Sequence, residues 1–191
     1  MSVAAVVLTS CAFGGEAPEP SSAAREERAT STVRLLPDFC SQLVSPLTVA
    51  SLVERELAGG RSAEYEPPDR SAGLVTGMTC REGVDSRGAA VTIYAGGFWD
   101  EPTARRFLRR IASTQSSSGL STGDQVRVQG KPALVIDSPA EVSSFVQEGR
   151  CAVVVTLRRG TVPDPRSRRT LLGITAAALE GLPDPATSPA G

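Results

Sequence analysis

The sequence has 191 residues, of which 40% are hydrophobic and 4% aromatic, and its formal net charge is −1; this length predicts one globular domain with tails. The near-neutral charge argues against a nucleic-acid-binding protein, because neutralising phosphates needs a basic excess concentrated on one face. The absence of histidine excludes Ser-His-Asp and Cys-His catalysis, histidine metal ligands and an imidazole pH switch.

A short apolar run opens the chain and stops at Cys11. It is far too short to span a bilayer. Its last residues, Leu8-Thr9-Ser10-Cys11, look like a bacterial lipobox, in which the cysteine after the cleavage site becomes diacylated. We therefore interpret residues 1–10 as a lipoprotein signal peptide and Cys11 as the lipidated residue. No basic residue precedes Cys11, so either the start codon lies upstream or the match is accidental and Cys11 is an ordinary thiol.

The segment that follows has the composition of a flexible tether. Residues 11–33 are rich in Ala, Pro, Ser and Glu and show no apolar period, which predicts disorder. Random-coil scaling for about 22 residues places the folded part roughly 25 Å from the lipid surface. Two acyl chains would hold the protein stably at a membrane face. Residues 34–183 are predicted to form a single α+β domain, and residues 184–191 a disordered tail.

The first predicted helix begins with Ser45-Pro46, a suitable N-cap and first-turn pair, and ends at Gly59-Gly60. Its apolar face consists of four residues at helical spacing: Val49, Leu52, Val53 and Leu57. Residues 61–71 contain Pro67-Pro68 and charges of both signs, so we predict a loop there.

A predicted β-hairpin and a second helix come next. Strand-like alternation begins at about Leu74 and resumes over residues 89–95, on either side of the turn signal at residues 85–88. The second helix has Asp100 as its expected N-cap and ends in a serine-rich loop at residues 113–124. Its apolar stripe consists of Ala104, Phe107, Leu108 and Ile111.

The second half of the chain contains four further predicted strands and one helix. The strands lie at residues 126–128, 133–136, 142–147 and 151–157. The helix runs over residues 164–180, with Gly181 as its C-cap. This order of elements predicts an α+β fold, in which about three helices pack mainly on one face of an antiparallel β-sheet.

One motif in the chain matches a catalytic pattern. Gly119-Leu120-Ser121-Thr122-Gly123 fits the G-x-S-x-G nucleophile elbow, but it lies in a serine-rich loop and the chain offers no histidine base. Lys131, the only lysine, has no S-x-x-K arrangement near it. The cysteines are too far apart for a zinc knuckle. We therefore expect no catalytic residue, metal site or cofactor, although carboxylates that meet only in space leave no sequence signal.

Arginine side chains gather in two places. The first group lies on the polar side of the second predicted helix and consists of Arg105, Arg106, Arg109 and Arg110. The second group lies near the third helix and consists of Arg158, Arg159, Arg166, Arg168 and Arg169. One interpretation is a solvated surface. The other is a contact for an anion, such as a lipid headgroup or a phosphate-bearing polymer.

The single tryptophan, Trp99, follows two glycines and precedes the second helix. In one interpretation its ring packs against Ala104 and fixes the entry of the chain into the helix. In the other, the ring is presented to a ligand. Both interpretations remain open from the sequence.

Three cysteines remain for the folded domain once Cys11 is lipidated. An exported protein of this composition is expected to contain one disulfide and one free thiol. The three cysteines allow three different pairings, and the residues alone do not choose among them.

Four short motifs resemble a known family: Asp38-Phe39-Cys40 before a helix, Cys80 in a strand, Cys151-Ala152-Val153-Val154-Val155 in a late strand, and Asp164-Pro165-Arg166 at the last helix. The pattern is similar to that of the actinobacterial envelope lipoproteins with domain of unknown function 3558. The resemblance covers roughly residues 35–183. It implies an extracytoplasmic lipoprotein and supplies no catalytic residue.

Three positions depart from the family pattern of D-P-C, C-x-W, a late-strand cysteine and a second D-P-C. Phe39 replaces the first proline, Glu82 the tryptophan and Arg166 the fourth cysteine. If the family pairs its first cysteine with its second and its third with its fourth, the resemblance implies a Cys40–Cys80 disulfide. Cys151 would then have no partner and behave as a small apolar residue.

These features predict a lipid-anchored cell-envelope lipoprotein at the extracytoplasmic face of the cell membrane, acting as a non-catalytic binding or accessory module. Its expected partners are the membrane, through the lipid anchor, and an envelope lipid, glycan or protein. No nucleic-acid partner is expected. The alternatives are a sensor or regulatory ectodomain for a membrane partner and an enzyme with a histidine-free mechanism.

Overall fold

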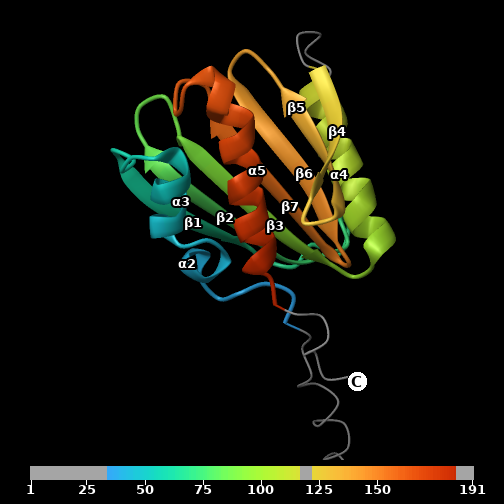
Figure 1. Ribbon diagram of the computed structural model, residues 1–191. Helices are drawn as coiled ribbons and strands as arrows, with labels where there is room; N and C mark the ends of the chain where they lie inside the picture. The colour runs from blue at the N-terminus through green and yellow to red at the C-terminus, as the bar shows by residue number, and fades with distance from the viewer. Residues whose placement is uncertain (1–33, 117–121, 184–191) are drawn as a thin grey trace, which may run out of the picture. The chain divides into compact units, whose positions relative to one another are not determined.

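The computed structural model describes residues 34–116 and 122–183. These residues form an α+β fold around one antiparallel sheet, as the order of elements predicts (Figure 1). The seven strands of the described part are β1 Gly60–Glu66, β2 Leu74–Val84, β3 Val91–Phe98, β4 Thr122–Val128, β5 Lys131–Asp137, β6 Glu141–Glu148 and β7 Cys151–Arg158. Their order across the sheet is β1-β2-β3-β7-β6-β5-β4.

Helices cover both faces of the sheet. The described part contains α2 Cys40–Leu43, α3 Pro46–Val53, α4 Glu101–Ser116 and α5 Asp164–Glu180. Three of these, α2, α3 and α5, lie on one face, which agrees with the expected packing mainly on one side, and α4 covers the other face (Figure 1). Each face of the sheet has its own hydrophobic core. Along β7, Val153 and Val155 belong to the larger core, under α5, whereas Ala152 and Val154 belong to the smaller core, under α4. Both faces of β7 are covered, which agrees with the continuous apolar run at its start, from Cys151 to Val155.

The larger core lies beneath α5. Leu171, Ile174 and Ala178 are fully buried there against the central strands. A buried hydroxyl pair joins the helix to β6, with Ser144 Oγ 2.5 Å from Thr175 Oγ1, and each hydroxyl gives the other the partner that burial demands. These contacts fix the position of α5 over the sheet.

Gly181, the expected C-cap, ends α5 in an ordinary right-handed conformation, with φ −78°. A side chain is excluded here by space, since a Cβ atom would lie 2.0 Å from the carbonyl oxygen of Leu43. Glycine is therefore needed for the close approach of the end of α5 to α2.

The smaller core lies beneath α4 and is partly aromatic. Phe98 is fully buried. The ring of Phe107 on α4 lies 5.0 Å from the ring of Phe98 and 5.3 Å from that of Tyr94, measured between centroids. These separations are typical of favourable aromatic pairs, so the three rings hold α4 on β3.

The prediction of a loop over residues 61–71 is wrong for its first part, because residues 60–66 form the edge strand β1. All but one of its residues are exposed, so the strand has no apolar alternation to reveal it. Backbone pairing with β2 holds it, together with ion pairs between Arg61 and Glu82 and between Arg81 and Glu64. Charged side chains of this kind are common on edge strands.

The first long helix, α3, is also shorter than predicted. It ends at Val53, where Glu54 adopts the left-handed conformation with φ 56°. Leu57, expected on its apolar face, lies beyond the helix but still packs partly buried against the larger core. Leu57 therefore continues the apolar spacing of the helix although it lies outside the helix. Among the described residues, no helix has the length and apolar character needed to cross a bilayer.

Candidate functional site

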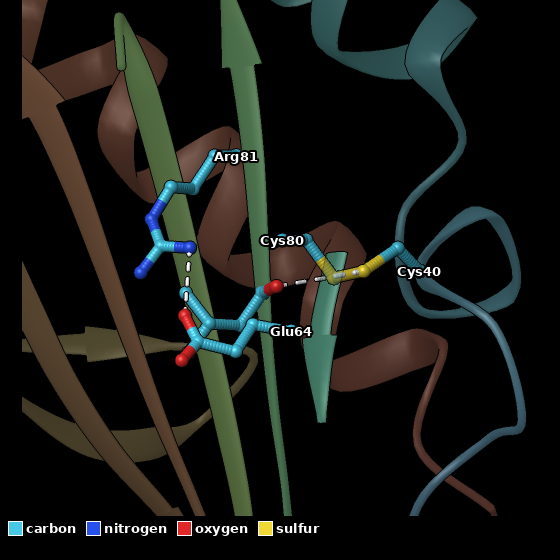
Figure 2. The surroundings of a disulfide bond; sticks show 5 residues. Cys40, Glu64, Cys80 and Arg81 are labelled. Atoms are coloured by element: carbon cyan, nitrogen blue, oxygen red, sulfur yellow. Dashed lines mark hydrogen bonds and ion pairs between the residues drawn. A yellow bond between two sulfur atoms is a disulfide. The ribbon is translucent and has the colours of Figure 1, made fainter. Parts of the chain in front are cut away.

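A disulfide joins Cys40 of α2 to Cys80 of β2, with the two Cα atoms 5.6 Å apart (Figure 2). This is the pairing that the family resemblance implies. Cys151 is the free cysteine of the described part, and it is buried. Its Sγ lies 3.3 Å from the carbonyl oxygen of Leu35, and burial raises the pKa of the thiol to about 11. Cys151 is therefore protonated at neutral pH and packs as an apolar residue.

Two sequence candidates lie outside the described residues: Cys11 and Ser121 of the G-x-S-x-G match. Lys131 begins β5 and forms an ion pair with Glu148. Within residues 34–116 and 122–183, no group of three or more Cys, Asp or Glu side chains gathers where it could hold a metal ion.

The second arginine group is largely neutralised by carboxylates. Its ion pairs are Arg158 with Asp85, Arg159 with Asp137 and Asp164, Arg166 with Glu54, and Arg168 with Asp124. Hydrogen bonds from Arg158 hold the pKa of Asp85 well below its ordinary value. A broad depression of about 850 Å³ borders Arg159, but that guanidinium is already bound by two carboxylates. These arginines connect elements of the fold.

The four arginines of α4 behave differently. The helical period places Arg106 and Arg110 on one flank of the helix and Arg105 and Arg109 on the other. Among the described residues, none of the four forms an ion pair. The structure thus divides the predicted anion-contact group into two pairs, and each pair borders its own hollow.

One hollow, about 500 Å³ in volume, lies between the start of α4 and the loop that joins β1 to β2. We call it the Trp99 hollow. Its lining includes Arg70, Trp99, Asp100, Arg106, Phe107 and Arg110. Arg70, from the loop, adds a third guanidinium to the pair from α4, and it too has no ion pair among the described residues.

The wall of the Trp99 hollow is held by contacts between the loop and α4. The backbone N–H of Trp99 donates to the carbonyl oxygen of Gly73 over 3.1 Å. Gly73 has φ 67°, and a Cβ atom there would lie 2.6 Å from Thr103 Cγ2, so the position requires glycine. The Asp69 carboxylate accepts hydrogen bonds from the hydroxyl and the backbone N–H of Ser71 and fixes the turn. These contacts fix the loop between β1 and β2 against the start of α4.

The acidic residues beside the hollow are occupied by hydrogen bonds rather than ion pairs. Asp100 is the N-cap of α4, as predicted, because its Oδ1 accepts from the backbone N–H of Thr103 over 2.7 Å. Hydrogen bonds from Thr103 lower the pKa of Asp100, and hydrogen bonds from Ser71 lower that of Asp69. Both carboxylates thus remain ionised. Asp100 also attracts Arg106, and Asp69 attracts Arg110, but neither attraction is a direct ion pair.

Two arginines of the hollow, Arg106 and Arg110, are positioned by contacts with their neighbours. Arg106 Nη2 donates to Thr103 Oγ1 over 2.7 Å. The guanidinium of Arg110 lies 5.9 Å from the ring centre of Phe107, within cation–π range. Trp99 is 51% exposed. Such exposure is what the ligand interpretation of Trp99 requires, and contact of the ring with Ala104 stays a prediction.

Two residues of the hollow were missed from the sequence. Arg70 lies in a predicted loop far along the chain from α4, and no spacing connects it to Arg106. The sequence feature that could have drawn attention to Arg70 is the turn formed by Asp69 and Ser71. This turn positions Arg70 but does not indicate a ligand. Phe107 was assigned only to the apolar core stripe, yet one side of it reaches the hollow.

No protein-family model matches the sequence, and a search of curated proteins finds no match. Among solved structures, the fold is similar to the crystal structure of the extracellular domain of PknH from Mycobacterium tuberculosis. The TM-score is 0.44 and the sequence identity 11%, over 78% of this chain and 99% of that one. A likeness of this size carries no argument about function.

Proposed function

We propose that the chain is an exported, lipid-anchored module that binds an acidic carbohydrate in the Trp99 hollow and performs no catalysis. The observation that supports the proposal is that a half-exposed tryptophan, Trp99, lines the same hollow as three arginines that have no ion pair among the described residues.

The two parts of the hollow fit the two parts of such a ligand. A flat, rigid indole ring packs against the apolar CH face of a sugar ring. Guanidinium groups bind phosphate or carboxylate through paired, charge-assisted hydrogen bonds. A neutral sugar would give Arg70, Arg106 and Arg110 no anionic partner, and a small anion alone would make no use of Trp99. An acidic sugar satisfies both.

Location outside the cytoplasm is supported by the Cys40–Cys80 disulfide, since structural disulfides persist mainly in oxidising compartments. The lipobox-like sequence ending at Cys11 supports attachment to the membrane. The resemblance to the family with domain of unknown function 3558 supports both, because its members are extracytoplasmic lipoproteins. A lipid-anchored module with this hollow would hold an acidic envelope glycan close to the membrane surface.

The binding test uses Trp99 as its reporter, because it is the only tryptophan in the chain. The full chain carrying C11S, which needs no detergent, is titrated with a hexose phosphate, the matching neutral hexose and inorganic phosphate. We expect the hexose phosphate to change the fluorescence at the lowest concentration. The R106Q/R110Q variant should bind it about tenfold more weakly, corresponding to about 1.4 kcal/mol.

The R168Q/R169Q variant is the matched control, since it removes two arginines from the opposite face and should bind normally. Equal affinity for the neutral hexose, or full affinity in R106Q/R110Q, contradicts the proposed site.

The lipid anchor is tested separately, by measuring the intact mass of the protein purified from its native membrane. The mass should show a diacylglycerol adduct on Cys11. An unmodified chain in the soluble fraction contradicts the anchor but leaves the hollow to be judged by the titration.

A further inference from the structure

A second hollow lies on the opposite flank of α4, between that helix and strands β5 and β6, and has a volume of about 520 Å³. We call it the α4–β5 groove. Its apolar lining includes Leu108 and Ala112 of α4 and, from the sheet, Leu134 and Phe145, which we call its floor. Its volume falls in the range of small-molecule sites. It shares no lining residue with the Trp99 hollow among the described residues.

The groove exists because the sheet extends beyond the helix. Strand register places Leu134, Phe145 and Val154 side by side in one row across β5, β6 and β7. Phe145 and Val154 are buried beneath α4, whereas Leu134, one strand further out, is only partly buried. The apolar row therefore continues past the edge of the helix, and Leu134 and Phe145 line the groove there.

The rim of the groove is basic. Arg105 and Arg109 lie one helical turn apart on α4, both are exposed, and neither has an ion pair among the described residues. Arg105 Nε donates to Gln147 Oε1 over 3.3 Å, a contact that leaves its charge uncompensated. Glu101, at the first turn of the helix, is the only acidic residue of the described part that lines the groove.

We propose that the α4–β5 groove binds a fatty-acid anion, with the alkyl chain on the apolar floor and the carboxylate on Arg105 and Arg109. An alkyl chain gains free energy by burying its surface against the apolar side chains of the groove. Guanidinium groups are the side chains best suited to receive a planar carboxylate, which they bind through two parallel hydrogen bonds. The basic rim thus matches the carboxylate of a fatty acid, and the apolar floor matches its alkyl chain.

The test is a calorimetric titration of the full chain carrying C11S, without detergent, using laurate, dodecanol and butyrate. Laurate should bind most tightly, because dodecanol lacks the charge and butyrate lacks the chain. The R105Q/R109Q variant should bind laurate about tenfold more weakly, to the level of dodecanol. Both arginines are exposed, so this variant should fold, and R168Q/R169Q serves as the control with the same loss of charge.

Three results would overturn the proposal: equal affinity for laurate and butyrate, equal affinity for laurate and dodecanol, or full laurate affinity in R105Q/R109Q. The fluorescence of Trp99 separates the two sites of α4. If laurate displaces the hexose phosphate from the Trp99 hollow, the carboxylate is bound there and the groove is not the site. A failure of hexose phosphate to bind leaves the laurate titration unaffected.

Discussion

The two faces of the sheet differ in what their side chains do. The face under α2, α3 and α5 has the larger core, a disulfide and a buried hydroxyl pair. The face under α4 has a smaller core, two hollows and four arginines with no ion pair among the described residues. Clustered like charges oppose folding, so another part of the molecule has to supply the stability. We infer that one face stabilises the fold and leaves the other free to bind.

The largest expected effect concerns the disulfide on the stabilising face. The C40A/C80A variant opens a loop closed by residues 40 positions apart, and the chain-entropy relation predicts a loss of about 4 kcal/mol in the free energy of unfolding. Urea denaturation measures this loss. Hydrogen exchange should then show lost protection in α2 and α3 before α4.

The matched control is C151A, which removes a buried cysteine but keeps the disulfide. It should lose clearly less stability than C40A/C80A. An equal loss in the two variants, or a first loss of protection in α4, would contradict the assignment of stability to the face under α5.

A pair of identical substitutions compares the two cores directly. Leu171, which is 0% exposed, belongs to the larger core, and Leu108, which is 9% exposed, belongs to the smaller one beside the α4–β5 groove. Leucine-to-alanine changes in cores cost about 2–5 kcal/mol, depending on the cavity left behind. We expect about 4 kcal/mol for L171A and about 2 kcal/mol for L108A. Equal losses in urea denaturation would show that the two cores stabilise the fold alike.

Periodicity in the sequence was sufficient for the elements that bury a regular apolar face. The hairpin of β2 and β3, the helices α4 and α5 and the strand β7 all appear where the pattern predicts them. It failed for β1, because that strand is exposed and depends on backbone pairing with β2. Periodicity also predicted α3 to be longer than it is, because Leu57 packs on the core from outside the helix.

The candidate site was only half predictable, because its parts meet in space and not along the chain. The two arginine groups look alike in the sequence, yet Arg158 is paired with Asp85, which lies 73 positions away. Arg106 and Arg110, by contrast, form no ion pair among the described residues. Arg70 joins them only because the turn at Asp69 lies against the first turn of α4. Sequence spacing encodes helix faces, but the partners that neutralise a charge come from other elements.

The smallest expected effect concerns pH and the N-cap of α4. Hydrogen bonds from the hydroxyl and the backbone N–H of Thr103 lower the pKa of Asp100 from its ordinary value of 3.8. The folded state thus favours the ionised carboxylate, so its stabilising effect is complete above that ordinary value and is lost as the pH falls through the lowered pKa. We expect D100A to lower the melting temperature at neutral pH, and the difference from the wild type to narrow in acid.

Asp69 and Asp85 also have lowered pKa values, so the wild type and D100A both lose stability in acid. Only the difference in melting temperature between D100A and the wild type reports on Asp100. D100N is the matched control, because asparagine still caps a helix but does not titrate. It should stay close to the wild type at neutral pH. A difference between D100A and the wild type that is constant with pH would mean that the carboxylate of Asp100 does not cap α4 as an anion.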